Sequence, residues 1–215
     1  MVRVDLHTHS VASPDGSLSA ADYKHILHSG RLDVIAVTDH NRIDFAQTLH
    51  ITVGDVIIVG EEIGAQEGEI VGLYLREAVP ANLTAVETIK RIHQQGGLVY
   101  IPHPFETARK GLPLAVLNAI AEHVDIIETC NGRTMQDRGV LAQKWSAGHG
   151  ASGAASSDAH GSIGWGNTYS ELSEKPTRDT LVELLRAAEY GTQSTGTIGR
   201  MYPKFNRLRK RGRHA

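Results

Sequence analysis

The stretch Val4-Asp5-Leu6-His7-Thr8-His9-Ser10, near the start of the 215-residue chain, decides how the rest is interpreted. Its apolar beginning is typical of a short β-strand that runs straight into His-x-His. Residues two apart on a strand point to the same face, so His7 and His9 are expected to aim at one spot beyond the strand's end. Two imidazoles placed in this way can hold one borderline metal ion such as zinc.

Composition places the chain among ordinary globular proteins. The length suits one domain with a full core, and the 40% hydrophobic and 21% charged contents are normal. Cys130 is the single cysteine, which excludes an intrachain disulfide. We find no apolar run long enough to span a bilayer and no signal peptide ahead of the first strand, so we expect a cytoplasmic protein without membrane association. Oligomeric state is not predicted.

The net charge of −2 conceals an uneven distribution. Seven of the 22 Lys and Arg residues follow Gly199 and no acidic residue does, which leaves 15 basic against 24 acidic residues in 1–199, a balance of −9. We therefore divide the chain into a domain over 1–199 and a basic C-terminal tail over 200–215. The tail could contact nucleic acid or an anionic substrate. Alternatively, it is a solvated, partly disordered end of the chain.

Short apolar stretches alternate with helical ones along the chain. Six strands are predicted after the first, at 33–37, 55–59, 69–75, 98–101, 124–128 and 151–156. Helices are predicted at 19–30, 44–50, 84–95, 113–122, 136–147 and 177–189. Ser19 and Asp22 match a capping box at a helix start, and Glu67-Gly68 is typical of a turn. The alternation predicts a parallel α/β sheet closed into a (β/α)7 barrel, with an open doubly wound sheet as the alternative.

Residues of metal-ligating type follow the C-terminal ends of six of these seven strands. A (β/α) barrel collects its active site at that edge. One such histidine would more often be structural, but buried imidazoles and carboxylates together are costly unless they are paired or hold metal. The pattern therefore predicts a metal cluster, with candidate ligands His7, His9, Asp15, His40, Glu62, His103, Cys130, Asp158 and His160.

Six motifs in a fixed order make the sequence resemble a known family. They are Leu-His-Thr-His-Ser (6–10), Ser-Pro-Asp-Gly (13–16), Thr-Asp-His-Asn (38–41), Gly-Glu-Glu-Ile (60–63), Ile-Pro-His-Pro-Phe (101–105) and Ser-Ser-Asp-Ala-His-Gly (156–161). Together they resemble the PHP (polymerase and histidinol phosphatase) family over residues 2–189. The resemblance implies a distorted (β/α)7 barrel with up to three divalent metal ions, usually zinc, manganese or iron. Most members hydrolyse phosphoesters.

The resemblance also implies which residues hold each metal. The first metal would have four ligands, namely His7, His9, Glu62 and Asp158. Glu62 would bridge to a second metal held by His103 and by the residue after the sixth strand, Cys130. The third metal would be held by Asp15, His40 and His160. Glu62 is preferred to Glu61 because the family pattern is Gly-x-Glu-Ile. Cys130 could instead be a buried structural thiol, whereas a thiolate ligand would favour zinc.

The implied reaction is hydrolysis of a small phosphate monoester, such as a nucleotide, sugar or amino-alcohol phosphate. A metal-activated water would attack phosphorus while cations neutralise the phosphoryl oxygens. Arg133 and Arg109 are the candidate phosphate anchors, because guanidinium suits bidentate phosphate contact. Asp158 and His160 are further catalytic candidates, as proton donors to the leaving group.

Three alternatives stay open at this point. The first is a 3′ or 5′ exonuclease on the same barrel, which the basic tail favours and the compact stretch from Glu62 to His103 disfavours. The second is a non-catalytic metal-binding module. The third is an amidohydrolase-type barrel, which also begins with His-x-His but matches the Asp158 and His160 pair less well.

Overall fold

The computed structural model describes residues 1–133, 136–193 and 196–212, and a nine-stranded sheet forms its centre. The strand order is β7-β6-β5-β4-β3-β2-β1-β8-β9. The strands are β1 (Val2–Asp5), β2 (Val34–Val37), β3 (Ile57–Gly64), β4 (Glu69–Leu73), β5 (Leu98–Ile101), β6 (Ile126–Asn131), β7 (Ser152–Ser156), β8 (Thr168–Leu172) and β9 (Glu189–Thr192).

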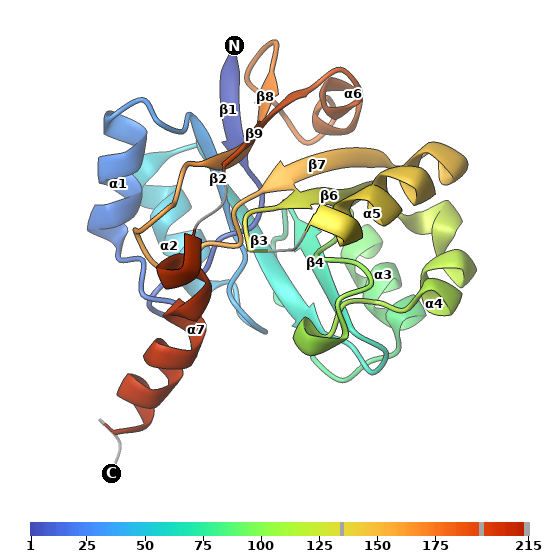
Figure 1. Ribbon diagram of the computed structural model, residues 1–215, viewed down its shortest axis with the longest axis horizontal. Coiled ribbons are helices and arrows are strands. Elements are labelled where there is room, and N and C mark those ends of the chain that lie inside the picture. The colour runs from blue at the N-terminus through green and yellow to red at the C-terminus, as the bar shows by residue number, and fades with distance from the viewer. Residues whose placement is uncertain (134–135, 194–195, 213–215) are drawn as a thin grey trace.

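The sheet curls until β7 lies beside β1. The Ser157 hydroxyl, just after β7, donates to Asp5 Oδ2 at 2.5 Å, and the Leu6 amide donates to Ser156 Oγ at 3.3 Å. Beyond β1, Ser170 of β8 bonds back to β7, accepting from the Ala155 amide at 2.8 Å. The result is a nearly closed barrel in one α/β domain (Figure 1), which confirms the predicted fold class.

Helices cover the outside of this sheet. They are α1 (Ala20–His28), α2 (Asp44–Val53), α3 (Ala85–Gln94), α4 (Leu114–Ala119), α5 (Gln136–His149) and α6 (Leu181–Arg186). A further helix, α7 (Gly196–Arg211), extends away from the sheet (Figure 1), and single 3₁₀ turns lie at Thr107–Arg109 and Ala121–His123. The predicted capping box is confirmed, since Ser19 and Asp22 bond reciprocally at the start of α1. In Figure 1, α1 and α2 lie on one side of the sheet and α3, α4 and α5 on the other.

Alternation along the strands divides the core into two clusters. Ile35 and Val37 of β2 pack outward with helix residues such as Ile26, whereas Val34 and Ala36 pack in the barrel interior. Both faces of β2 are therefore apolar, as expected for a strand covered on two sides. Polar groups concentrate instead where the strands end.

One strand direction differs from the prediction. The sequence analysis predicted a parallel sheet, but β4 pairs antiparallel with both β3 and β5. β3 ends at Gly64 and β4 begins at Glu69, around the predicted Glu67-Gly68 turn. A parallel pair needs a crossover of about a dozen residues or more, so a connection this short dictates a hairpin.

Three elements near the C-terminus were not predicted: β8, β9 and α7. β8 and β9 pair antiparallel with each other, and β8 also pairs with β1. The helix predicted over 177–189 is shorter, Leu181–Arg186, because β9 starts at Glu189. Helix α7 begins at Gly196, before the domain boundary expected after Gly199.

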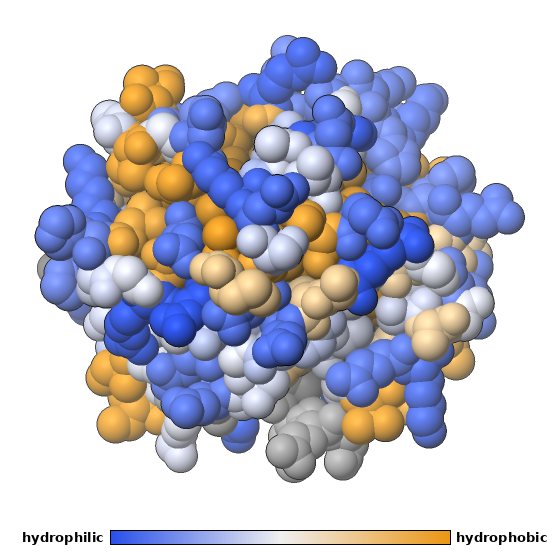
Figure 2. Space-filling view, turned by 90° about the horizontal axis from the view of Figure 1, so that it is seen from above, coloured by the Kyte–Doolittle hydropathy of each residue, from blue (hydrophilic) through white to orange (hydrophobic). Residues whose placement is uncertain are grey.

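Polar and apolar side chains are mixed on the face of the molecule shown in Figure 2. Figure 2, seen from above, shows apolar side chains reaching the surface in separate patches between charged ones. Within the described part of the chain, no helix is both long enough and apolar enough to cross a bilayer.

Candidate metal centre

Eight of the nine candidate ligands meet at the C-terminal edge of the barrel. Their nitrogen and oxygen atoms form groups in which every ligand atom lies within 4.8 Å of the others. These groups are His9, Asp15, His40 and His160; His7, His103 and Asp158; His7, His9 and Glu62; and His40, Glu62 and Glu69. These eight residues come from or directly follow five of the six strands predicted to supply ligands, namely β1, β2, β3, β5 and β7, whereas Cys130 of β6 lies outside the groups.

The first two histidines have the geometry of metal ligands. His7 Nδ1 lies 3.2 Å from Glu128 Oε1, to which it can donate its N–H, and in the neutral ring Nε2 then carries the lone pair. That nitrogen faces His9 Nε2 at 3.1 Å and Glu62 Oε1 at 3.5 Å. Metal-bound histidines usually give their second N–H to a carboxylate in this way. A lone pair aimed at another imidazole and a carboxylate fits a cation between them, so these donors suit a divalent metal.

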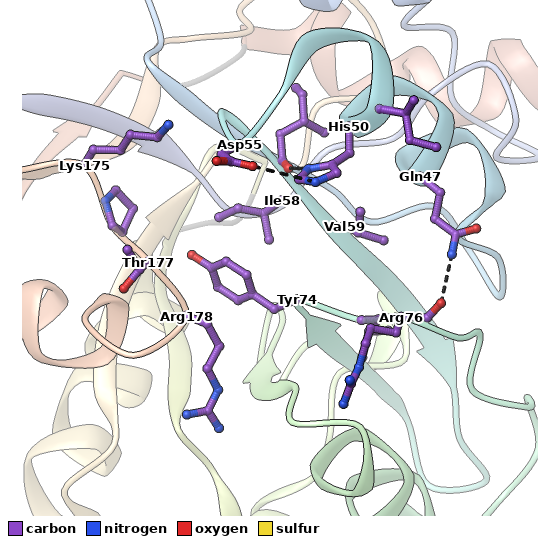
Figure 3. Close-up of a pocket in the computed structure, with 14 residues that line it drawn as sticks. Gln47, His50, Asp55, Ile58, Val59, Tyr74, Arg76, Lys175, Thr177 and Arg178 are labelled. Carbon is purple, nitrogen blue, oxygen red and sulfur yellow. Dashed lines mark hydrogen bonds and ion pairs between the residues drawn. The ribbon is translucent and has the colours of Figure 1, made fainter.

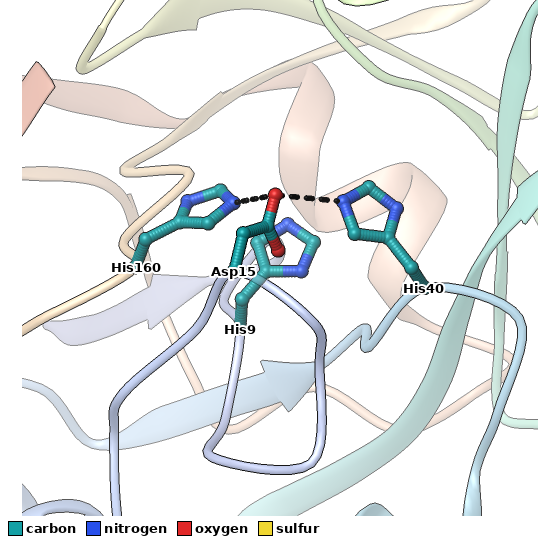
Figure 4. Close-up of side chains that lie close together, drawn as sticks. All are labelled: His9, Asp15, His40 and His160. Carbon is teal, nitrogen blue, oxygen red and sulfur yellow. Dashed lines mark ion pairs between the residues drawn. The ribbon is translucent and has the colours of Figure 1, made fainter. Parts of the chain in front are cut away.

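A second group surrounds Asp15 in the loop after β1. His40 Nε2 and His160 Nε2 each lie 3.5 Å from Asp15 Oδ2, on opposite sides of it (Figure 4). The His9 ring stacks on both neighbours, with centroids 4.7 Å from His40 and 4.1 Å from His160. The residues expected to hold a third metal therefore do lie together, and His9 joins them.

The electrostatics of the cluster favour bound positive charge. Burial alone would lower the pKa of His7, but Asp158, Glu62 and Glu128 raise it well above its usual value. Burial likewise opposes the charge on His40, yet Glu62 and Asp15 raise its pKa to about 9. The carboxylates thus draw protons onto His7 and His40 in a nearly water-free site, a role that a divalent cation would take over.

Two of the clustered residues have strained backbones. His103 has φ = 29° and Asp158 has φ = 50°, in the left-handed region that few non-glycine residues adopt. The His103 amide donates to Glu128 Oε2 at 2.6 Å, which helps to fix that conformation. Such strain persists where the surroundings over-determine it and is common at functional sites.

The sequence analysis missed two buried acids. Glu69 Oε2 lies 3.7 Å from His103 Nε2, and its Oε1 lies 3.9 Å from His40 Nδ1. Burial and the neighbouring Glu62 raise the pKa of Glu69 to about 8. Glu128 holds His7 and His103, as described above. The signal for Glu69 was the short turn, because an antiparallel β4 presents its first residue at the site edge.

Cys130 lies outside these groups. Among the described residues, no set of candidate ligand atoms includes its sulfur. Burial and the charge on Glu128 raise the pKa of its thiol to about 11, which disfavours a thiolate. The pairing of β6 with β7 shifts register between Glu128 and Cys130. The neighbouring Asn131 faces the site instead, and its Nδ2 donates to Glu128 Oε2 at 2.8 Å.

Both predicted arginines border the cluster. Arg109 Nη1 lies 2.6 Å from Asp158 Oδ2, and Arg133 Nη1 lies 3.0 Å from the same oxygen. Arg109 Nη2 lies 2.7 Å from Glu106 Oε2, and Asn131 Oδ1 accepts from the Arg133 backbone amide at 2.8 Å. Arg133 Nε is buried and has no hydrogen-bond acceptor within the described residues. Burial opposes ionisation of Asp158, but Arg133 and His7 bring its pKa well below its usual value.

Helix α7 packs against the loops that carry Asp15 and His160, so the solvated end considered for this segment is wrong. Asn206 Nδ2 donates to the backbone oxygens of Asp15, at 2.8 Å, and His160, at 3.0 Å. Arg207 Nη2 lies 2.6 Å from Asp15 Oδ2. A Cβ at Gly161 would lie 2.5 Å from the Tyr202 ring, so this close packing requires glycine.

Comparison with known proteins places the chain in a family and a fold. No family model matches it. It is 34% identical over 184 residues to the uncharacterized protein MJ0417 of Methanocaldococcus jannaschii, covering 80% of this chain and 71% of that protein. The chain therefore belongs to the family of MJ0417.

Two solved structures share the fold. A two-domain protein of Bacteroides vulgatus containing a predicted PHP-like metal-dependent phosphoesterase has a TM-score of 0.74 at 18% identity. That match covers 89% of this chain and 65% of the other, so the chain spans just under two thirds of its length. A proposed metal-dependent phosphoesterase of Bifidobacterium adolescentis has a TM-score of 0.63 at 17% identity, covering 85% of this chain and 95% of the other. At these identities the likeness establishes a PHP-like fold.

Proposed function

We propose that the protein is a PHP-type, metal-dependent phosphoesterase that hydrolyses a small phosphate monoester. The observation that carries this proposal is the convergence of imidazoles and carboxylates from separate strand ends on one buried cluster with arginines at its edge. Anionic ligands alone would hold a cation, and arginines alone would hold an anion. Their combination suits a reaction in which metal and phosphate meet.

We assign the metals to the residues that lie together. A first group, His7, His9, Glu62 and Asp158, and a second, Asp15, His40 and His160, keep the assignment that the resemblance implied. We replace Cys130 by Glu69, which approaches His103 and Glu62. When bound, divalent metals would lower the pKa of a coordinated water and neutralise phosphoryl charge.

The remaining chemistry belongs to side chains of this chain. Arg133 would bind phosphoryl oxygen through its guanidinium, whose Nε has no acceptor among the described residues, and Arg109 would bind alongside it. Glu106 and Asn131 would hold the Arg109 guanidinium in place, since Arg109 donates to Glu106 Oε2 at 2.7 Å and to Asn131 Oδ1 at 3.2 Å.

His160 Nδ1 lies 3.2 Å from Arg133 Nη1 and 3.3 Å from Asp158 Oδ1. Burial, His9 and Arg133 lower the pKa of His160 to about 3, and Arg133 and His7 hold the pKa of Asp158 well below its usual value. Neither side chain would carry a proton for the leaving group near neutral pH, so we propose Asp158 and His160 as metal ligands rather than as proton donors.

The experiment is hydrolysis of a substrate panel by metal-stripped protein resupplied with zinc, manganese or iron. The panel holds phosphomonoesters, dinucleotides and short oligonucleotides. We expect metal-dependent release of phosphate from monoesters, only weakly affected by salt. Preferential cleavage of oligonucleotides with a steep salt dependence would indicate the exonuclease instead. Hydrolysis of neither class, with metals bound, would indicate a non-catalytic metal-binding module.

A further inference from the structure

A cavity lies at the end of the barrel opposite the metal centre. It has a volume of about 850 Å³ and is lined by α2, the start of β3, the chain after β4 and the loop before α6 (Figure 3). Ile57 of β3 lines it, whereas Glu62 of the same strand reaches the metal cluster. Five residues of extended strand separate the two by about 16 Å. The cavity is thus a separate site.

Its walls are mostly aliphatic. Ile51, Ile58, Val59, Leu75 and Pro176 are among the lining residues, and Ile51 at the rim is 82% exposed. The volume falls within the range of about 300–1,000 Å³ found for small-molecule sites. An apolar ligand body would therefore find both room and matching walls.

Tyr74 supplies one polar group in this apolar setting. It follows β4 with φ = 58°, a strained conformation for an aromatic residue. Figure 3 shows its ring between Ile58 and Arg178, with the hydroxyl directed toward the side of Thr177. That hydroxyl is buried and has no hydrogen-bond partner among the described residues. An unsatisfied donor beside a cavity is a natural contact for a ligand oxygen.

Positive charge dominates the rim. Arg76, Lys175 and Arg178 line the cavity, against one carboxylate, Asp55. Arg76 and Arg178 are fixed at the end of α3, where they donate to the backbone oxygens of Gln95 at 2.7 Å and Gly96 at 2.8 Å. Lys175 is exposed and makes no hydrogen bond or ion pair within the described ranges, so its ammonium can turn toward a ligand.

We propose that this cavity binds a small amphipathic anion, with an aliphatic body against the walls and a carboxylate head near Lys175 and the Tyr74 hydroxyl. A polar ligand such as a nucleotide base would leave its hydrogen-bonding groups facing aliphatic side chains, which is costly. A cationic amphiphile would meet the wrong charge at the rim. The proposal does not depend on the chemistry at the metal centre.

The test is titration of the full chain with decanoate, followed by calorimetry and thermal unfolding. Decyltrimethylammonium, which has the same tail and the opposite charge, is the ligand control. We expect decanoate to bind once per chain and to raise the melting temperature, and the cation to do neither. Equal binding of both amphiphiles, several decanoates per chain, or no binding up to about 1 mM would overturn the proposal.

Variants with matched controls locate the site. Lys175→Glu should weaken decanoate binding by at least about 10-fold, and Lys24→Glu on the exposed face of α1 should not. Ile51→Glu should abolish binding, in contrast to Val86→Glu, which changes another exposed apolar residue, on α3. Tyr74→Phe should weaken binding by about 3-fold to 10-fold while the free protein stays folded. Decanoate affinity unchanged in folded Lys175→Glu and Ile51→Glu would also overturn the proposal.

Discussion

At the scale of single residues, the site combines ligand-type side chains with groups that hold them. Glu128 bonds to the His7 ring and to the His103 amide at once, so one carboxylate orients two neighbouring residues. Tyr100 donates to the same carboxylate at 2.7 Å. Such supporting contacts fix ring orientation and tautomer. They come from residues with no recognisable motif, and a sequence alone does not reveal them.

Asp158→Asn tests the role of the central carboxylate. It removes a charge and barely changes volume, so we expect turnover of a phosphate monoester to fall at least ~100-fold while the fold is kept. The measurement is steady-state kinetics beside metal analysis and circular dichroism. Full activity of the variant with its metals in place would locate the chemistry elsewhere.

Arg133→Ala separates substrate binding from metal binding. If Arg133 anchors phosphate, the variant should keep its metals and show a higher KM, with a lower kcat as well if the contact strengthens in the transition state. Arg138→Ala, which changes an exposed arginine on α5, is the control. Unchanged kcat and KM in Arg133→Ala would exclude the anchor.

Glu69→Gln and Cys130→Ser test which residue completes the cluster. We expect Glu69→Gln to lose at least part of the bound metal, because a neutral amide is a poorer ligand than a carboxylate. Cys130→Ser should keep the full complement. The opposite pattern, with metal lost only from Cys130→Ser, would restore the assignment that the family resemblance implied.

At the scale of elements, the largest difference from the predicted site is helix α7, which was not predicted and which contacts the loops that carry Asp15 and His160. Its basic residues do not simply face solvent, since Arg207 contacts the Asp15 carboxylate, and the neighbouring Asn206 donates to the Asp15 backbone. Lys210 donates to the backbone oxygens of Val11, at 2.7 Å, and Ser13 in the same loop. The helix therefore supports the residues proposed to hold one metal.

Truncation after Gly199 tests this support. Without Asn206 and Arg207, the Asp15 loop loses its contacts to α7, and the His160 carbonyl keeps only the Ser17 hydroxyl as donor, so the loop can shift. We therefore expect activity to fall roughly 10- to 100-fold. Lys204→Ala, on the exposed side of α7, should leave activity unchanged. A truncated protein with the kcat and KM of the full chain would contradict a supporting role for α7.

Whether an element could be predicted from the sequence depends on whether its signals are local or depend on distant partners. Strands β1 to β7 were found because apolar runs and turn residues mark them locally. β8 was missed although Thr168–Leu172 alternates between buried and half-buried positions, since its partner β1 lies far away in sequence. Glu69 was missed because strand direction was assigned from the α/β pattern, although the nine residues between the strands predicted at 55–59 and 69–75 were already too few for a parallel crossover.

At the scale of the whole molecule, the barrel brings the candidate metal ligands together at the C-terminal edge of its strands. The opposite edge is left for the cavity proposed to bind an amphipathic anion. Burying five carboxylates and five imidazoles in one cluster would cost much free energy without compensating positive charge. Arginines at Asp158 and Asp15 offset part of this charge. Divalent ions would offset the rest, so the stability of the folded chain should depend on them.

The most direct test of this account is the metal content of the purified chain, combined with its thermal unfolding before and after chelation. We expect about two to three divalent ions per chain, as the ligand groups and the family resemblance indicate. Resupplying metal in large excess over its Kd should raise the melting temperature by roughly 10 °C, because ligands that bind only the folded state stabilise it. A chain that carries no metal and gains no stability from added zinc, manganese or iron would contradict the account.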